Sequence, residues 1–372
     1  MRLSDLGTII TGKTPTTKKE EYWNGNVPFV TPGDIQGIKH IFKTARNVTE
    51  EGMQAVKGAI LPPNAVCVSC IGNIGYVGIT TKKCVSNQQI NSIIVSEDHN
   101  HDYVFYLIKS LWPFFKHYEG QSTTLSIMNK TQFSQIEVPD FTRLQEDRIA
   151  ETLCALDDKI EHNNAINENL LLQVETLFKE RFLTCDEMPV GWKRMIIGDV
   201  SDMSAGGDKP KNISKQKTEE HLYPIYSNGI SEEGLYGFTS DYKISEESVT
   251  VSARGTIGFV CLRHIPFTPI VRLVTLVPHT SIVSAKYLYL WLKSIQIHGT
   301  GTTQQQLTVP DFRKTEIIIP PEAEMKEFTE TVNPLFWQVW SNQAENEKLA
   351  DIRDALLPKL MSGELDISKL DI

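Results

Sequence analysis

The sequence predicts an α+β protein in which two similar α/β modules are separated by two long antiparallel coiled-coil helices. Three observations predict this fold class: two regions of short β-type runs punctuated by Gly and Pro, a long heptad-patterned stretch after each region, and a repeat at an offset of 179 residues. The expected segments are a first module at 1–141, a first helix at 142–184, a second module at 185–321, and a second helix with a C-terminal tail at 322–372.

The β-type runs follow one another in the same order in both modules. Residues 68–75 match residues 251–258 in pattern, and each module closes on an apolar run that ends in proline, at Pro139 and Pro320. Proline ends the last strand because it cannot donate to a sheet, and it frees the chain to enter a helix. Two copies of one α/β fold are therefore expected.

The two helical stretches carry the clearest copy of the repeat. Apolar residues alternate at spacings of three and four in both stretches, and asparagines interrupt both seams at equivalent places: Asn163, Asn167, Asn342 and Asn346. A buried amide costs stability but fixes the register of paired helices. In an antiparallel pair, Asn163 should face Asn346 and Asn167 should face Asn342, with Leu177 beside Val332 and Leu156 beside Arg353. The alternative is that each helix packs on its own module and leaves these amides exposed.

The composition is that of a globular protein. The chain has 372 residues, 40% of them hydrophobic, no run of 18 apolar residues and no signal-peptide opening, so we expect a cytoplasmic protein. The net charge of −9 is distributed unevenly along the chain. Residues 141–186 carry 10 acidic against 5 basic side chains, residues 320–372 carry 11 against 5, and the modules are near neutral. The modules can therefore present a local basic face to nucleic acid.

The cysteines have no disulfide or metal-binding framework. They are Cys67, Cys70, Cys84, Cys154, Cys185 and Cys261. Cys67 and Cys70 alone have the spacing of a redox or zinc pair, but they lie in an apolar run without a second Cys or His pair. We interpret all six as free thiols.

Two enzyme patterns give an alternative function. Residues 7–14 satisfy the phosphate-binding loop pattern, but β-branched residues fill the loop and Pro15 stands where a helix should begin, so we interpret this stretch as a turn. Asp311, Glu324 and Lys326 have the order of a nuclease site. Such a site needs its carboxylates at the ends of adjacent strands, and Glu324 and Lys326 fall on a predicted helix.

Four motifs carry a family resemblance. They are Gly12-Lys13-Thr14-Pro15 with Tyr22-Trp23-Asn24-Gly25, residues 27–35, Asn87-Gln88-Gln89-Ile90-Asn91, and residues 353–365. Together with the repeat they make the whole chain resemble the specificity subunit of a type I restriction-modification system.

The resemblance implies a DNA-recognition subunit without catalysis of its own. Each module would be a target-recognition domain that reads one half of a bipartite site in duplex DNA. The helices would set the spacing, since a seam from Ile149 to Leu177 spans roughly 43 Å, about 13 base pairs. They would also dock two modification subunits, and the acidic outer positions Asp157, Asp158, Glu345 and Glu347 are candidates for this contact. Restriction subunits, with endonuclease and translocase activities, are expected as further partners. AdoMet, ATP and Mg are expected on these partners, adenine methylation being the reaction of the modification subunits, and no cofactor, metal or membrane is expected for this chain.

Candidate DNA contacts follow from the chemistry of readout, because base edges need side chains that donate and accept while phosphates need Lys, Arg, Ser and Thr. In the first module the candidates are Lys13, Lys18, Lys19, Thr31, Asn73, Lys82, Lys83, Asn87, Gln88 and Gln89. In the second module they are Lys209, Lys211, Lys215, Ser227, Asn228, Arg254, Gln304, Gln305 and Gln306. Any single one could instead be a solvated surface residue, and residues 87–89 could serve only to form a turn.

Overall fold

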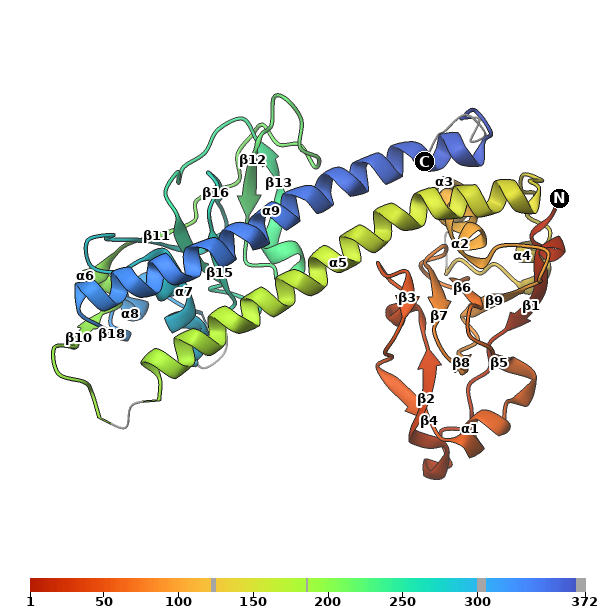
Figure 1. The fold of residues 1–372 in the computed structure, drawn as a ribbon, viewed down its shortest axis with the longest axis horizontal. Helices are drawn as coiled ribbons and strands as arrows, with labels where there is room; N and C mark the ends of the chain where they lie inside the picture. Colours follow the sequence, from red (N-terminus) through yellow and green to blue (C-terminus); the bar gives the residue numbers. More distant parts are fainter. Residues whose placement is uncertain (122–124, 185–186, 300–305, 366–372) are drawn as a thin grey trace. The chain divides into compact units, whose positions relative to one another are not determined.

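The computed structural model describes residues 1–121, 125–184, 187–299 and 306–365. The chain divides into two compact units, Met1–Asn163 with Gln343–Ile372, and Asn164–Asn342. Each unit contains one β-rich module together with part of each long helix (Figure 1). The α+β class with two repeated modules and long helices, expected from the sequence, is confirmed.

The first module consists of two sheets. The larger sheet has the order β1 (Gly7–Thr11), β9 (Ile90–Val95), β6 (Val66–Ser69), β7 (Val77–Thr80), β3 (His40–Ile41). The smaller sheet has the order β4 (Arg46–Val48), β2 (Trp23–Val30), β8 (Cys84–Ser86), β5 (Ile60–Leu61). The helices of this module are α1 (Glu50–Gln54), α2 (His101–Ser110), α3 (Trp112–Gly120) and α4 (Lys130–Ser134), with short 3-10 turns at Leu3–Asp5, Glu20–Tyr22, Pro32–Asp34 and Lys57–Ala59.

The second module repeats this topology. Its larger sheet has the order β11 (Ser201–Ala205), β17 (Val274–Pro278), β14 (Ser248–Val251), β15 (Val260–Arg263), and its smaller sheet has the order β13 (Leu235–Thr239), β12 (Tyr223–Tyr226), β16 (Thr268–Pro269). Each smaller sheet has one parallel pair of strands, β2 with β8 in the first module and β12 with β16 in the second, and its other pairs are antiparallel. The remaining elements are β10 (Lys193–Ile196) paired with β18 (Glu316–Ile319), α6 (Ile197–Val200), a 3-10 turn at Ser231–Gly234, α7 (Ala285–Ser294) and α8 (Val309–Phe312).

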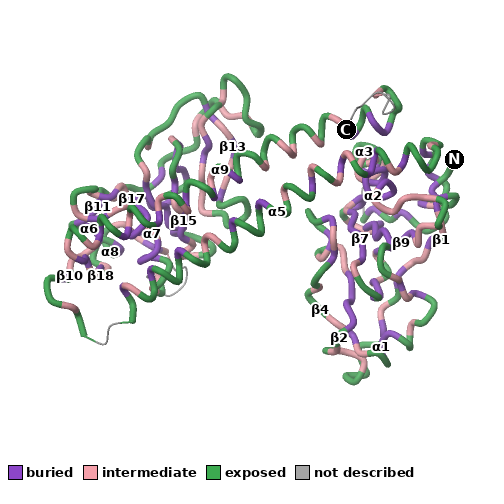
Figure 2. Tube along the Cα trace, viewed as in Figure 1, coloured by how far each residue is buried: buried purple, intermediate pink, exposed green. Residues whose placement is uncertain are grey.

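A buried helix closes the core of each module. All six residues from Tyr103 to Ile108 of α2 are buried, the helix packs on β6 and β7, and Figure 2 shows this concentration of burial. The Asn100 side chain caps α2 by accepting hydrogen bonds from the amides of Asp102 and Tyr103. In the second module α7 packs on β14 and β15 in the same way, and Ser284 caps it. The apolar runs of the sequence therefore form the expected cores.

The two long helices, α5 (Arg143–Phe182) and α9 (Glu322–Met361), run antiparallel to each other within each unit. In the first unit Asn163 Nδ2 donates to Asn346 Oδ1 at 2.8 Å, and in the second unit Asn342 Nδ2 donates to Asn167 Oδ1 at 2.8 Å. These are the partners that the sequence register pairs. The helices also pack on the modules, because Leu153 belongs to the core of the first module and Phe328 to that of the second.

Two details of the expected seam are wrong. Leu177 is 39% exposed, and Phe178 takes the buried place because it packs on Tyr287 and Phe328 of the second core, with ring centroids 5.3 Å and 5.9 Å away. Arg353 meets Asp157 instead of Leu156, with Nη1 2.6 Å from Oδ1. Asp157 is therefore buried in an ion pair and is not on the outer face of the helix.

The interpretation of residues 7–14 as a turn is also wrong. Gly7–Thr11 form strand β1, which pairs antiparallel with β9 from Gly7 opposite Val95 to Thr11 opposite Asn91. A strand paired along its length cannot wrap a phosphate in a loop ahead of a helix. None of the helices described is long and apolar enough to cross a membrane.

Candidate nucleic-acid interface

In the first module several strands end at the same edge. Thr11 at the end of β1 lies opposite Asn91, and Ser69 at the end of β6 lies opposite Ile90, where β9 begins. Val30 at the end of β2 lies beside Ser86 at the end of β8. The segments that follow these strands therefore emerge together. We call residues 12–14, 31, 70–73 and 87–89 the first edge.

A rigid turn forms the centre of the first edge. The Asn87 amide donates to the Val30 carbonyl at 2.9 Å, and the Ile90 amide donates back to the Asn87 carbonyl at 3.2 Å. The Gly12 amide donates to the Ile90 carbonyl at 3.0 Å, and a Cβ on Gly12 would lie 2.1 Å from the Asn87 carbonyl oxygen. Glycine is required there because the two backbones pass so closely.

The side chains of the first edge are linked but keep free donors. Thr14 Oγ1 donates to Gln88 Oε1 at 2.5 Å, and Asn87 Nδ2 donates to Gln89 Oε1 at 2.8 Å. Among the residues described, the Nε2 groups of Gln88 and Gln89 have no hydrogen-bond partner. The hydrogen bonds that the two Oε1 atoms accept therefore hold both glutamine side chains in place, while their Nε2 groups can still donate to a ligand.

Two other candidates of the first edge have different surroundings. The Thr31 hydroxyl donates to Asp34 Oδ2 at 2.6 Å and is used in capping the turn Pro32–Asp34. Asn73 is exposed, and its carbonyl oxygen accepts a hydrogen bond of 2.6 Å from the Ser69 hydroxyl, so its side chain remains available. Lys13 is also exposed.

Four lysines lie away from the first edge. Lys82 and Lys83 occupy the turn between β7 and β8, at the opposite end of β8 from Asn87. Lys18 and Lys19 precede β2, at the opposite end of that strand from Thr31, and Lys19 Nζ is hydrogen-bonded to the Tyr22 hydroxyl at 3.2 Å. All four are exposed, and the structure does not bring them together with the glutamines.

The second module has an edge with the same connections. The Ile270 amide donates to the Tyr226 carbonyl at 2.9 Å, the Leu273 amide to the Ile270 carbonyl at 3.1 Å, and the Gly206 amide to the Leu273 carbonyl at 2.8 Å. These bonds correspond one by one to those of the turn at 87–90. We call residues 206–209, 227–228, 253–254, 270–272 and 306 the second edge.

The polar side chains of the second edge differ in how free they are. Both polar groups of the Asn228 side chain are engaged, since Nδ2 donates to the Val271 carbonyl at 2.6 Å and Oδ1 accepts from the Ala253 amide at 2.7 Å. The Ser227 hydroxyl donates weakly to the Gly234 carbonyl at 3.4 Å. Arg254 Nη2 donates to Gln306 Oε1 at 3.2 Å, and Gln304 and Gln305 lie outside the described residues. Asn228 therefore ties the loops of the edge together.

A basic cluster lies around Tyr236 of β13. Lys209 Nζ donates to the Tyr236 hydroxyl at 2.7 Å, and the ammonium groups of Lys209 and Lys215 lie 4.8 Å and 4.5 Å from the ring centroid. The hydrogen bond from Lys209 and its positive charge lower the pKa of Tyr236. Lys211 is exposed on the same loop. This cluster offers positive charge and an aromatic face to a polyanion.

The comparisons with known proteins decide the family. The model of the type I restriction modification DNA specificity domain matches residues 1–172 and 189–350. The chain belongs to this family of DNA specificity subunits. Its function is thus DNA sequence recognition within a type I restriction-modification system, and the family is one of recognition subunits and not of enzymes. Its partners are, in general terms, DNA and the other subunits of such a system.

Comparisons with individual proteins give the same family. The specificity subunit of the type I restriction enzyme MjaIX from Methanocaldococcus jannaschii is 28% identical over 99% of this chain and 94% of its own length. That of the enzyme HindI from Haemophilus influenzae is 34% identical over 37% of this chain and 30% of its own length. The crystal structure of a type I S subunit from M. genitalium shares the fold, with a TM-score of 0.61 at 17% identity, covering 97% of this chain and 95% of that one.

The nuclease alternative finds no support in the specificity subunit. Asp311 lies in α8, where its carboxylate accepts from the Thr308 hydroxyl at 2.7 Å, while Glu324 and Lys326 lie on α9 and Lys326 approaches Glu330 at 3.9 Å. In the described ranges no group of three His, Cys, Asp or Glu side chains is placed to hold a metal ion.

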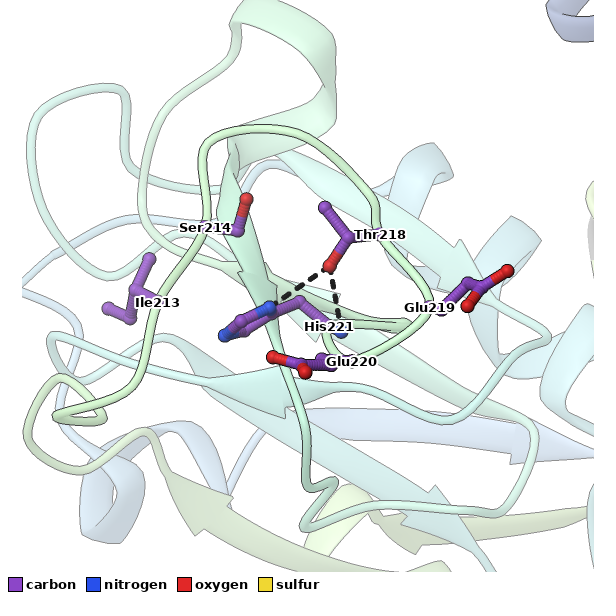
Figure 3. Close-up of a pocket in the computed structure, with 6 residues that line it drawn as sticks. All are labelled: Ile213, Ser214, Thr218, Glu219, Glu220 and His221. Carbon is purple, nitrogen blue, oxygen red and sulfur yellow. Dashed lines mark hydrogen bonds between the residues drawn. The ribbon is translucent and has the colours of Figure 1, made fainter.

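A hollow of about 590 Å³ lies on the exposed loop that carries Lys215. Figure 3 shows the residues that line it, among which the Thr218 hydroxyl is hydrogen-bonded to His221 Nδ1 at 3.0 Å. Glu219 and Glu220 also line it, and their carboxylates repel phosphate. The hollow is therefore not a part of the specificity subunit suited to DNA.

Sequence reasoning missed one segment in each module of the specificity subunit. The backbone bonds make Ile270, Val271 and Arg272 the counterparts of residues 87–89, and the matching bonds from Met128 to Cys70 and from Leu307 to Ala253 make Ile127 the counterpart of Gln306. The offset of 179 residues that aligns the two helices misaligns the turn at 87–90 with the turn at 270–273 by four residues. A search that allowed insertions between the copies could have found it.

Proposed function

We propose that this specificity subunit reads a bipartite site in duplex DNA, with the first edge on one half and the second edge on the other. The observation that carries the proposal is that each of two compact units has the same strand-end edge with a different set of polar side chains. In this proposal residues 1–141 and 185–321 are the target-recognition domains, and the helical segments 142–184 and 322–372 set the spacing between the half-sites.

The two edges would use different chemistry. Gln88 and Gln89 suit the major-groove edge of adenine, which offers one acceptor and one donor, while Lys13 suits phosphate. Arg254 and Lys209 of the second edge, and Lys215 of the cluster around Tyr236, favour phosphate or guanine, whose major-groove edge offers two acceptors. The two half-sites should therefore differ in sequence.

The long helices would dock the modification subunits. Several of their apolar side chains are exposed and would be available for this contact: Leu144, Ile166, Leu172, Leu177, Trp337 and Ile352. The acidic residues Asp158, Glu345 and Glu347 remain candidates for this contact, while Asp157 is withdrawn because it is buried. Two modification subunits, and restriction subunits beyond them, are the proposed partners. AdoMet, ATP and Mg would bind to those partners, and the DNA ligand supports the expected cytoplasmic location.

Replacing Gln88 and Gln89 by alanine tests the reading of one half-site. The full chain, assembled with its modification subunits, selects sequences from a randomised duplex library. We expect the double variant to lose discrimination at positions of one half only, by about 1–3 kcal/mol per lost base contact, because base contacts specify and phosphate contacts do not.

The matched control is Gln54→Ala, which removes an exposed glutamine at the end of α1, and this variant should select the wild-type sequence. Equal loss at both halves, or no loss at either, would contradict the assignment of the first edge to one half-site.

A further inference from the structure

We propose that Arg272 determines the specificity of the second edge by reading a guanine in its half-site. This inference rests on the proposed function and names the base class that one residue recognises. Arg272 was not among the candidates that the sequence indicated. Its position, its backbone and its free guanidinium each support the assignment.

The position of Arg272 matches that of Gln89. Both residues are third in a four-residue turn whose first amide bonds to the end of the central strand of the smaller sheet, at Val30 or Tyr226. Both turns are closed by the amide of the fourth residue, Ile90 or Leu273, donating to the carbonyl of the first. Arg272 therefore occupies the second edge where the first edge presents a glutamine.

The backbone of this turn is in a rare conformation. Val271 has φ +52° and Arg272 has φ +61°, so both central residues are left-handed, as in a type I′ turn. Such turns usually contain Gly, Asn or Asp, and a β-branched residue in this region is a true outlier. Backbone strain of this kind persists where the surroundings enforce it, and it clusters at ligand-contacting positions.

Three hydrogen bonds enforce the conformation. The Val271 amide donates to the Gly207 carbonyl at 2.9 Å, the Arg272 amide donates to the Gly206 carbonyl at 2.8 Å, and Asn228 Nδ2 donates to the Val271 carbonyl at 2.6 Å. The Cα of Arg272 is thus fixed before any ligand arrives, which lowers the entropy lost on binding.

The guanidinium of Arg272 is free to bind a ligand. The other arginines of the second module have partners: Arg194 with Glu316, Arg254 with Gln306, Arg263 with Glu233, and Arg313 with the Gly198 carbonyl. Arg272 is exposed, and its guanidinium donates to no other group within the part of the chain that the structure describes. The turn holds the Arg272 backbone in place, and the N–H groups of its guanidinium have no partner. Such a side chain is suited to a ligand with two adjacent hydrogen-bond acceptors.

Guanine fits this requirement best among the bases. Its O6 and N7 accept both N–H groups of one arginine in the major groove, whereas adenine offers one acceptor and one donor. A phosphate could also accept the fork, but it would carry no sequence information. The following experiment distinguishes binding to guanine from binding to phosphate.

The test compares Arg272→Gln and Arg272→Lys with wild type in the full chain assembled with its modification subunits. Each complex selects from a randomised duplex library, and the enrichment of guanine over the other bases is measured at every position. The matched control is Arg194→Gln, an exposed arginine paired with Glu316 on β18. We expect both Arg272 variants to lose guanine enrichment about tenfold or more at one position of the second half-site. Lysine should fail because it keeps the charge but lacks the planar fork.

Selection in the first half-site serves as the folding check and should be unchanged. A uniform loss of binding with guanine enrichment kept would make Arg272 a phosphate contact and overturn the proposal. Unchanged enrichment in both variants would also overturn it while leaving a bipartite site in place. If wild type itself selects no split site, the proposed function fails, which is a different result.

Discussion

Asp157 shows how a single residue can depend on partners that the helical pattern does not indicate. Its carboxylate accepts a hydrogen bond from the Tyr106 hydroxyl of α2 at 2.6 Å and pairs with Arg353 of α9 at 2.6 Å. Burial, together with the neighbouring Asp157 carboxylate, raises the pKa of Tyr106. The heptad pattern describes only the seam between α5 and α9 and places residue 157 outside it, whereas Asp157 of α5 contacts both α2 and α9. Its role could not be predicted from spacing alone.

The first module's cysteine pair can also be understood at the residue scale. Cys67 and Cys70 are buried in or beside β6, and burial raises their pKa values to about 12 and about 11. The thiolate is the reactive form, so both thiols should be inert near pH 8. This environment is that of structural cysteines.

Alkylation measures this inertness. In native protein at pH 8, iodoacetamide should leave Cys67 and Cys70 unmodified, and in denaturant it should label both, as read by mass spectrometry of the peptides. Labelling should begin only as the pH approaches the raised pKa values. Rapid labelling of either thiol in the native protein at pH 8 would reopen the redox interpretation.

Elements with a strong apolar period were the most predictable part of the structure. The two long helices, the strands around residues 66–69 and 248–251, and the helix at 101–110 follow from their apolar patterns. The burial of Phe178 in place of Leu177 could not be predicted, because the aromatic cluster of Phe182, Tyr287 and Phe328 on which Phe178 packs comes from segments distant in sequence. The edges were unpredictable for the same reason, since register between strands decides which loop ends meet.

The asparagine pair in the seam is expected to contribute specificity rather than stability. Asn167 and Asn342 are 7% and 5% exposed and bond to each other, so Asn342→Ala leaves a buried amide without its partner. We expect a loss of about 1–3 kcal/mol in the free energy of unfolding, measured with urea. Replacing both residues by leucine should cost less than the single change, because no polar group remains unpaired.

The control for this comparison is Asn169→Ala, which alters an exposed asparagine on α5, the helix that carries Asn167, and should change stability little. A double leucine variant that is less stable than Asn342→Ala would show that the amide pair stabilises the helices in a way that this account does not include.

At the scale of the whole molecule, the repeat is one of topology more than of sequence. The strand orders β1-β9-β6-β7 and β11-β17-β14-β15 are the same, yet the turns at 87–90 and 270–273 share little chemistry. Two domains that recognise different DNA sequences would need the same strand order and different side chains at their edges. The sequence indicated the duplication because core positions are constrained by packing, while exposed edge positions are free to change.

The spacing role proposed for the helices can be tested by shortening both of them. Deleting residues 164–170 and 339–345 removes one heptad from each helix and keeps the seam in phase, shortening it by roughly 10 Å, or about 3 base pairs. Methylated adenines are then mapped in a genome that carries the variant with its modification subunits. We expect both half-site sequences to be retained and the distance between them to decrease by about 3 base pairs. An unchanged distance between the two half-sites would contradict this spacing role.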